Sequence, residues 1–280
     1  MKKISRRSFL AAAGLSVAAL ALTACGGSSS SVASSVASSA AASSEAASTS
    51  AAAGELATVE AGKLTMATNA TFPPYEMTTD AGDIEGIDVE TAQAIAEKLG
   101  LELQIDDMDF DAALLSVQQG KADIAMAGIT VTDERKAVMA FSDSYATGIQ
   151  SIIVPNDSDI ASPDDLAGKK IGTQRGTTGY IYCSDDFGDE NVVAYDDGLT
   201  AVQALNNGQV DAVVIDNAPA QEFVAANPGL KVLDTSYAEE DYAIGMAKGS
   251  ALEDAVNKAL EELKADGTLQ AIVDKYINAN

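Results

Sequence analysis

The chain has 280 residues, of which 47% are hydrophobic and 21% are charged, so it is long enough to bury a sizeable core. Its formal net charge of -25 makes nucleic acid a poor partner, because binding nucleic acid normally depends on clustered lysine and arginine. It contains no histidine, which excludes serine–histidine and cysteine–histidine catalysis and removes the commonest metal ligand. No cofactor motif is visible, so we expect neither a metal nor a cofactor.

Residues 1–24 have the anatomy of a secretory signal: a basic start, an apolar run over residues 9–22 and small residues before Cys25. The apolar run is shorter than the ~20 residues that an ordinary membrane span needs. The segment around Arg6 and Arg7 resembles a twin-arginine export signal, and the general secretory route stays equally open.

Leu22-Thr23-Ala24-Cys25 resembles a bacterial lipobox, in which the peptide is cut before the cysteine and the thiol receives diacylglycerol. The alternative is an ordinary cleaved signal with a chance cysteine. Residues 25–61 are almost entirely Ser, Ala, Gly and Thr, so they cannot bury enough surface to offset their ordering entropy. We expect a flexible tether that carries the folded part at the outer face of the cytoplasmic membrane, on the cell surface or in the periplasm.

Beyond residue 62, short strand-like runs alternate with helical patterns, which predicts an α/β fold with largely parallel sheets. Strands are expected over residues 63–69 and 101–105. The helix between them is expected to be capped by Asp88 and ended by Gly100. Its apolar stripe consists of Val89, Ala92, Ile95, Ala96 and Leu99.

Two further elements are predicted from their start signals. Ser162 and Pro163 open a short helix, and a strand follows over residues 170–174. Ser250 and Glu253 form a capping-box pattern before a closing helix. The apolar stripe of that helix consists of Leu252, Val256, Ala259, Leu260 and Leu263.

A short pattern occurs twice, as GKAD at residues 120–123 and GQVD at residues 208–211, each after a helical pattern and before an apolar strand. Eight residues after the two glycines come Gly128 and Asp216. If the halves are equivalent lobes, these two residues lie at matching strand ends and face one cleft, where ligands of open α/β sheets bind.

Arg135 follows two threonines after a short strand, in a chain with few cations, which is the composition of an anion pocket. An arginine can hold a carboxylate through two parallel hydrogen bonds, a geometry that lysine cannot reproduce. Thr130 offers a hydroxyl nearby. Taken without further information, a surface helix position beside Glu134 and Lys136 is the simpler interpretation of Arg135.

Two other features suit a ligand site. The GTTG turn at residues 176–179 lies between a predicted strand and a predicted helix, so its N–H groups can face an anion, although such a turn can also simply cap the helix. Asp216 ends an apolar run and can bind a cation or cap the next helix. Cys183 is expected to be a small apolar filler.

Ten motifs spread over about residues 63–276 carry a resemblance. In chain order they are FPPYE, GIDV, FDAALL, QQGKAD, GITVTDER, FSDSY, DLAGKKIG, GTTG, GQVDAVVID and DKY. Together they resemble bacterial extracellular solute-binding protein family 3, the substrate-binding lipoproteins of polar amino acid ABC transporters, such as glutamine- and lysine-arginine-ornithine-binding proteins.

The resemblance implies a two-lobed, type II periplasmic binding protein-like fold. Each lobe is a mixed sheet flanked by helices, and two strands form the hinge. Lobe 1 is expected over residues 62–149 and 242–280, and lobe 2 over residues 150–241. The hinge strands are expected near residues 148–154 and 242–247.

The resemblance also assigns roles within the site. Arg135 and Thr130 hold the ligand carboxylate together with the GTTG turn, while Asp216 and the Gly128 carbonyl hold the ammonium. Aromatic rings enclose the ligand side chain. The predicted ligand-binding residues are Asn69, Phe72, Tyr75, Phe110, Gly128, Thr130, Arg135, Arg175, Thr177, Thr178 and Asp216.

Asn69 bears on ligand choice. Relatives that select cationic or amide side chains often have aspartate there, so the neutral amide removes the obvious counter-ion for a lysine or arginine ligand. We expect a neutral polar L-amino acid such as glutamine or cystine. Arg175 departs from the uncharged residue expected at its position and keeps an acidic ligand open.

The implied function is transport: a lipid-anchored monomer binds a free L-amino acid by hinge closure and presents it to an ABC transporter permease. We expect no enzymatic activity. The alternatives are an enzyme on the same fold, similar to cyclohexadienyl dehydratase or a cell-wall lyase, and a sensory ligand-binding subunit. An enzyme needs a cleft carboxylate with a raised pKa, and Asp216 is better explained by an ammonium.

Overall fold

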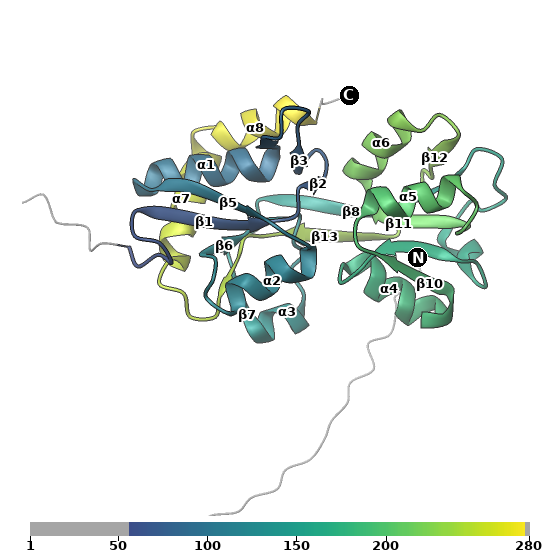
Figure 1. The fold of residues 1–280 in the computed structure, drawn as a ribbon, viewed down its shortest axis with the longest axis horizontal. Helices are drawn as coiled ribbons and strands as arrows, with labels where there is room; N and C mark the ends of the chain where they lie inside the picture. The colour runs from purple at the N-terminus through teal and green to yellow at the C-terminus, as the bar shows by residue number, and fades with distance from the viewer. Residues whose placement is uncertain (1–55, 278–280) are drawn as a thin grey trace, which may run out of the picture. The chain divides into compact units, whose positions relative to one another are not determined.

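The computed structural model describes residues 56–277, which are coloured in Figure 1. The predicted signal peptide, most of the tether and the lipidation site at Cys25 lie outside these residues. No helix in the described part of the chain is long and apolar enough to cross a membrane. Two large sheets organise the fold, and we call the parts built on them lobe 1 and lobe 2.

Lobe 1 is built on a mixed sheet in which β1 runs parallel to β5 and β6, while β14 runs antiparallel to β6 and β7. In spatial order the strands are β5 (Glu102–Asp107), β1 (Lys63–Thr68), β6 (Ile124–Ala125), β14 (Gly245–Ala247) and β7 (Met139–Phe141). A small antiparallel sheet beside it contains β2 (Thr71–Phe72), β3 (Glu76–Thr78) and β4 (Ile84–Glu85).

Helices cover both faces of the lobe 1 sheet. Successive residues of β1 point to opposite faces, and apolar side chains on each face pack against helices. Leu64 and Met66 pack in one core cluster and Ala67 in another. The first cluster contains residues from α1 (Ile87–Leu99), α7 (Glu253–Ala265) and α8 (Thr268–Tyr276). The second contains residues from α2 (Phe110–Gln118), and Figure 1 shows α3 (Asp133–Val138) beside α2.

Lobe 2 is built on a sheet with parallel β10, β9 and β11, to which β8, β12 and β13 add antiparallel pairing. Its strands are β10 (Val192–Tyr195), β9 (Ile171–Gln174), β11 (Ala212–Asp216), β8 (Ala146–Pro155), β12 (Leu230–Val232) and β13 (Ala238–Tyr242). Its helices are α4 (Thr178–Phe187), α5 (Gly198–Asn206) and α6 (Asn217–Ala226), with 3-10 turns η1 (Pro163–Leu166) and η2 (Asp189–Asn191). Cys183 on α4 is fully buried in the core, as predicted.

Two paired strands join the lobes. The chain enters lobe 2 through β8 and returns through β13, and these strands pair antiparallel, with Gly148 opposite Glu240 (Figure 1). The predicted second hinge strand, residues 242–247, is wrong: only its first residue belongs to β13, and Gly245–Ala247 forms β14 in the lobe 1 sheet. The lobe limits expected from the sequence stay a prediction.

Most expected elements are present, but two caps differ. Gly100 ends α1 in the left-handed conformation, as predicted, whereas Asp88 is not the N-cap. Gly86 is the N-cap instead. Its φ is 139°, and a Cβ atom there would collide with the Tyr75 carbonyl, so only glycine fits this position. The side chain of Asp88 is buried instead and accepts a hydrogen bond from the Gly128 N–H at 3.0 Å.

The capping box predicted at the start of α7 is also wrong. The helix begins at Glu253, and Ser250 accepts a hydrogen bond from the Leu252 N–H instead of capping the helix. The apolar stripe of this helix is buried as predicted. A capping box does form at η1, where the Ser162 start was expected and where Asp165 supplies the second partner.

Candidate functional site

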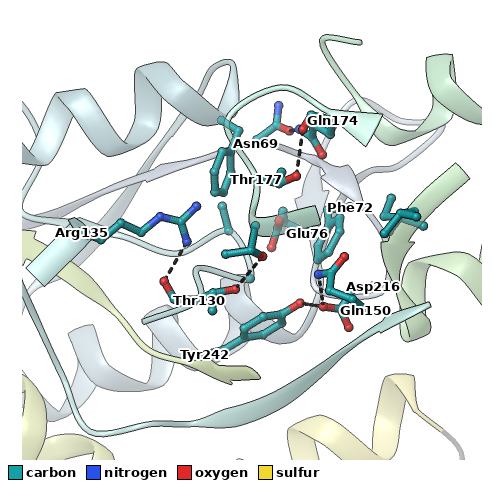
Figure 2. Close-up of a pocket in the computed structure, with 16 residues that line it drawn as sticks. Asn69, Phe72, Glu76, Thr130, Arg135, Gln150, Gln174, Thr177, Asp216 and Tyr242 are labelled. Carbon is teal, nitrogen blue, oxygen red and sulfur yellow. Dashed lines mark hydrogen bonds between the residues drawn. The ribbon is translucent and has the colours of Figure 1, made fainter. Parts of the chain in front are cut away.

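A pocket lies where the carboxyl ends of strands from both lobes meet (Figure 2). Loops after β1 and β6 line it from lobe 1, and β8, β11 and the turn between β9 and α4 line it from lobe 2. The lining residues are Asn69, Phe72, Glu76, Phe110, Ala127, Gly128, Thr130, Arg135, Gln150, Gln174, Thr177, Thr178, Val214, Ile215, Asp216 and Tyr242. All the residues predicted for the site except Tyr75 and Arg175 are among them.

Tyr75 lies behind the pocket rather than in its wall. It is buried, and its ring stacks on that of Phe72 with the ring centroids 5.7 Å apart. Its ring also packs edge-to-face with that of Tyr242, with the centroids 5.4 Å apart. It therefore supports the aromatic wall that Phe72 forms. The prediction that Tyr75 lines the pocket is wrong, because the turn after Phe72 points the tyrosine into the lobe 1 core.

Arg175 lies outside the pocket as well. Gln174 points inward and is buried, so the next side chain points out. The Arg175 guanidinium is exposed, lies 3.6 Å from Asp196 and lines a separate surface depression with Asp109 and Asp111. The structure does not place it with the other predicted site residues.

Arg135 is the cation of the site. It lies on α3, where Thr132 caps the helix by accepting a hydrogen bond from the Arg135 N–H. Only 8% of the residue is exposed, so the surface-helix interpretation is wrong. Its guanidinium donates to the carbonyls of Thr130 at 2.7 Å and Gly176 at 3.1 Å, and lies 5.3 Å from the ring centre of Phe110.

Arg135 has no salt-bridge partner among the residues that the structure describes. Burial lowers its pKa, because desolvation disfavours the charged form, and the nearby Glu240 charge opposes the change. A buried charge without a counter-ion is costly, so the geometry is that of a site for an anion.

The turn before α4 completes this end of the pocket. Thr177 caps α4 by accepting a hydrogen bond from the Tyr180 N–H at 3.3 Å, and the Thr178 hydroxyl lies 3.4 Å from that of Thr130. The amino end of a ten-residue helix therefore faces the pocket beside Arg135. Free N–H groups and the helix dipole both favour an anion there.

Asp216 lies at the other end of the pocket and is 2% exposed. One oxygen accepts from the N–H groups of Ile149 and Asn217, so the residue caps α6 as well as lining the pocket. The other oxygen accepts from the Gln150 amide and the Tyr242 hydroxyl. Desolvation raises the pKa of Asp216, and these hydrogen bonds oppose the rise.

Gly128 and Asp216 line the same pocket, as the repeated sequence pattern predicts. Gly128 has a φ of 55°, and a Cβ atom there would lie 2.7 Å from the Phe72 ring. Only glycine fits this close approach without strain.

Amides line the side of the pocket near Asn69 (Figure 2). The Gln174 amide donates to the Asn69 side-chain oxygen at 2.8 Å, and Asn69 donates to the Met108 carbonyl at 3.0 Å. These bonds fix the orientation of both amides. Phe72 and Phe110 supply apolar surface.

The sequence interpretation missed four polar lining residues: Glu76, Gln150, Gln174 and Tyr242. Gln150 bridges two buried carboxyl groups, since its amide donates to Asp216 at 3.2 Å and to Glu240 at 3.0 Å. A usable signal was present, because a glutamine that interrupts the apolar run of β8 is costly to bury without partners.

Residues 64–279 match the model of the bacterial extracellular solute-binding proteins, family 3. The chain belongs to this family. The two-lobed α/β fold expected from the sequence is confirmed. In the part of the family fold that the structure describes, no three potential metal ligands of the His, Cys, Asp and Glu types gather.

Several similar proteins are named after an amino acid or were solved with one bound. The L-cystine-binding protein TcyJ of Escherichia coli (strain K12) is 33% identical over 225 residues, which cover 79% of this family member and 85% of the relative. The structure of an ancestral arginine-binding protein bound to glutamine has a TM-score of 0.74 at 40% identity, covering 78% and 99% of the two chains. That of the amino acid ABC transporter substrate-binding protein AbpA from Streptococcus pneumoniae, bound to L-arginine, has a TM-score of 0.73 at 37% identity, covering 77% and 94%.

Proposed function

We propose that this family member binds a free L-amino acid with a neutral polar side chain, such as glutamine or cystine, and delivers it to the permease of an ABC importer. The observation that carries the proposal is the buried charge of Arg135, which has no salt-bridge partner among the described residues, at one end of a pocket that has Asp216 at the other. A zwitterion supplies a carboxylate for the first residue and an ammonium for the second.

The carboxylate end consists of Arg135, the hydroxyl of Thr130 and the turn that carries Thr177 and Thr178. Arg135 is the main contact, because its planar fork can donate two parallel hydrogen bonds to a carboxylate. At the other end, the ammonium lies near Asp216 and the Gly128 carbonyl.

The amides near Asn69 support a neutral ligand side chain. Asn69 and Gln174 offer hydrogen-bonding groups without charge, and Phe72 and Phe110 offer apolar surface for the methylene groups of a ligand. The names of the relatives include cystine-binding and arginine-binding proteins. Asn69 supports the neutral ligand, because it carries no negative charge for a guanidinium.

Hinge closure is the mechanism that the inter-lobe contacts support. Asn69 and Arg135 of lobe 1 bond with Gln174 and Gly176 of lobe 2 across the pocket. We infer that the ligand docks on lobe 1 and that lobe 2 then closes over it, with β8 and β13 as the hinge. The permease recognises the closed form.

The proposed setting is the outer face of the cytoplasmic membrane, where a lipid on Cys25 and a tether over residues 25–61 hold a monomeric binding protein. Cell fractionation tests this part. Cys25→Ser is expected to move the protein from the membrane fraction to the soluble extracytoplasmic fraction. An unchanged distribution would contradict the lipid anchor.

The enzyme alternative has less support. Burial raises the pKa of Asp216, as an enzyme would need, but the residue accepts hydrogen bonds from four donors, which fix its orientation and leave it poorly placed to exchange a proton with a substrate. The similar proteins named above are binding proteins. A sensory subunit would have the same pocket and would differ in its partner.

A thermal-shift screen of residues 55–280 against the common L-amino acids and cystine tests the proposal. Ligand at 100 times its Kd stabilises a protein by about 2.7 kcal/mol, which raises the melting temperature measurably. Arg135→Ala and Asp216→Ala are expected to abolish the shift, and the exposed Arg175→Ala is expected to keep it. No shift with any amino acid, or a shift that both pocket variants keep, would sink the proposal.

A further inference from the structure

Glu240 is a buried carboxyl group of the hinge that lies behind the pocket. On β13 burial alternates along the strand, so that Glu240 and Tyr242 are buried while Glu239 is exposed. Only 6% of Glu240 is exposed, and the residue is not part of the pocket lining. Burying a carboxyl group is costly unless other groups satisfy it, so its hydrogen-bond partners indicate what it does.

One carboxyl oxygen of Glu240 accepts two hydrogen bonds from residues that line the pocket. The Thr130 hydroxyl donates at 3.1 Å, and the Gln150 amide donates at 3.0 Å. Both donors are buried. Thr130 follows β6 of lobe 1, whereas Gln150 lies on the hinge strand β8. Glu240 therefore joins lobe 1 to the hinge behind the pocket.

The two donors belong to opposite ends of the pocket. Thr130 lies at the cationic end, where its carbonyl accepts a hydrogen bond of 2.7 Å from the Arg135 guanidinium. Gln150 lies at the acidic end, where its amide also donates to Asp216 at 3.2 Å (Figure 2). Through Glu240, a chain of hydrogen bonds connects Thr130 at one end with Asp216 at the other.

Both donors need a partner to hold one orientation. A threonine hydroxyl has a single hydrogen that can rotate, and a glutamine amide can turn either its oxygen or its nitrogen toward a neighbour. An acceptor shared by both settles these choices, because buried polar networks with satisfied members hold a single arrangement.

We propose that Glu240 is a positioning residue of the ligand site, which holds the Thr130 hydroxyl and the Gln150 amide in fixed orientations across the hinge. The proposal rests on the proposed function. It assigns Glu240 no contact with the ligand, because the residue lies outside the pocket lining. Its effect on affinity passes through the two residues that it holds.

Two substitutions separate the acceptor from the charge. Glu240→Gln keeps an oxygen that can accept both hydrogen bonds, and it removes the charge. Glu240→Met has nearly the same shape and no strong acceptor. Glu239→Met is the matched control, because this neighbour on the same strand is exposed and lies outside the pocket.

Calorimetric titration with L-glutamine is expected to show a 10- to 100-fold loss of affinity in Glu240→Met, because two buried donors lose their acceptor. Glu240→Gln and Glu239→Met are expected to stay within about threefold of the wild type. Wild-type affinity in Glu240→Met would overturn the proposal. Equal losses in Glu240→Met and Glu240→Gln would also overturn it, since the charge and not the acceptor would then matter.

A double-mutant cycle with Thr130→Val distinguishes positioning from a general loss of structure. If Glu240 acts through Thr130, Glu240→Met weakens binding at least about threefold less in the Thr130→Val background than in the wild type. Losses that simply multiply would contradict an action through Thr130.

Failure of the wild type to bind any amino acid would instead remove the proposed function. A crystal structure of the wild type with L-glutamine decides the matter even if Glu240→Met does not fold. A Glu240 oxygen within about 3.2 Å of both the Thr130 hydroxyl and the Gln150 amide is expected beside the bound ligand. A ligand-bound site in which either contact is broken would contradict the assignment.

Discussion

The guanidinium of Arg135 donates a hydrogen bond of 3.1 Å to the carbonyl of Gly176, so a buried cation of lobe 1 contacts the turn that begins α4 in lobe 2. The guanidinium also donates a hydrogen bond to the backbone carbonyl of Thr130. Carbonyls orient the guanidinium without neutralising it. The proposed ligand carboxylate would meet both a positive charge and a guanidinium whose orientation the two lobes fix together.

Arg135→Lys tests the geometry separately from the charge. Lysine keeps the positive charge but cannot donate two parallel hydrogen bonds, so we expect affinity for the ligand to fall at least tenfold. Arg175→Lys is the matched control on an exposed arginine and should leave affinity unchanged. Calorimetric titration measures both, and wild-type affinity in Arg135→Lys would contradict the fork geometry.

Asn69→Asp tests the basis of ligand choice. A carboxylate at this position adds a counter-ion beside the aromatic wall, and it loses the hydrogen bond that Asn69 donates to the Met108 carbonyl. We expect the affinity ratio of L-arginine to L-glutamine to rise about tenfold, because a buried charge pair gains roughly 1–2 kcal/mol over a neutral contact. Competition binding measures the ratio. An unchanged ratio would show that Asn69 does not face the ligand side chain.

Asp88 is expected to make stability depend on pH. Desolvation raises its pKa from 3.8 to about 6, so the folded protein holds a proton that the unfolded chain releases between these values. The stabilisation is fully present below pH 3.8 and is lost as the pH rises through about 6. The roughly two-unit shift corresponds to on the order of 3 kcal/mol.

Urea denaturation of the wild type and of Asp88→Asn at pH 4.5 and pH 7 checks this dependence. The wild type is expected to lose more free energy of unfolding across the interval than Asp88→Asn does. The exposed Asp83→Asn serves as the control and should follow the wild type. Identical pH slopes in the wild type and Asp88→Asn would contradict the assignment.

Gly148→Ala tests the packing at the hinge. A Cβ atom there would lie 2.5 Å from the Tyr242 ring and 2.7 Å from an Asp216 oxygen. We expect a destabilisation of about 1–3 kcal/mol from overpacking, together with weaker ligand binding because Asp216 must move. Gly229→Ala meets open space and should be close to neutral. Chemical denaturation measures both variants. Equal stabilities of Gly148→Ala and Gly229→Ala would contradict the predicted overpacking at the hinge.

The sequence predicted the site residues that end strands or begin helices. Gly128 and Asp216 follow short apolar runs, so their placement at or just beyond strand ends followed from the chain order of the elements, whereas Arg135 lies in the first turn of α3. The helix-cap predictions at Asp88 and Ser250 were wrong. The buried Asp88 side chain accepts a hydrogen bond from the Gly128 N–H, and the Ser250 hydroxyl accepts one from the Leu252 N–H in the turn before α7.

Contacts that depend on strand pairing were out of reach of the sequence. Glu240 and Gln150 meet only because β13 and β8 pair, and nothing local to either segment announces the contact. The same holds for Arg175, whose outward direction follows from the inward direction of Gln174. Its charge suggested a ligand role, but its side chain is exposed and lies outside the pocket.

The most direct test of the central claim compares a bound amino acid with its two blocked derivatives. Calorimetric titration would use L-glutamine, N-acetyl-L-glutamine and L-glutamine amide, which remove the ammonium and the carboxylate in turn. If Arg135 and Asp216 hold the two ends of a zwitterion, L-glutamine binds and both derivatives lose at least 100-fold in affinity. Derivatives that bind as well as L-glutamine would contradict the account.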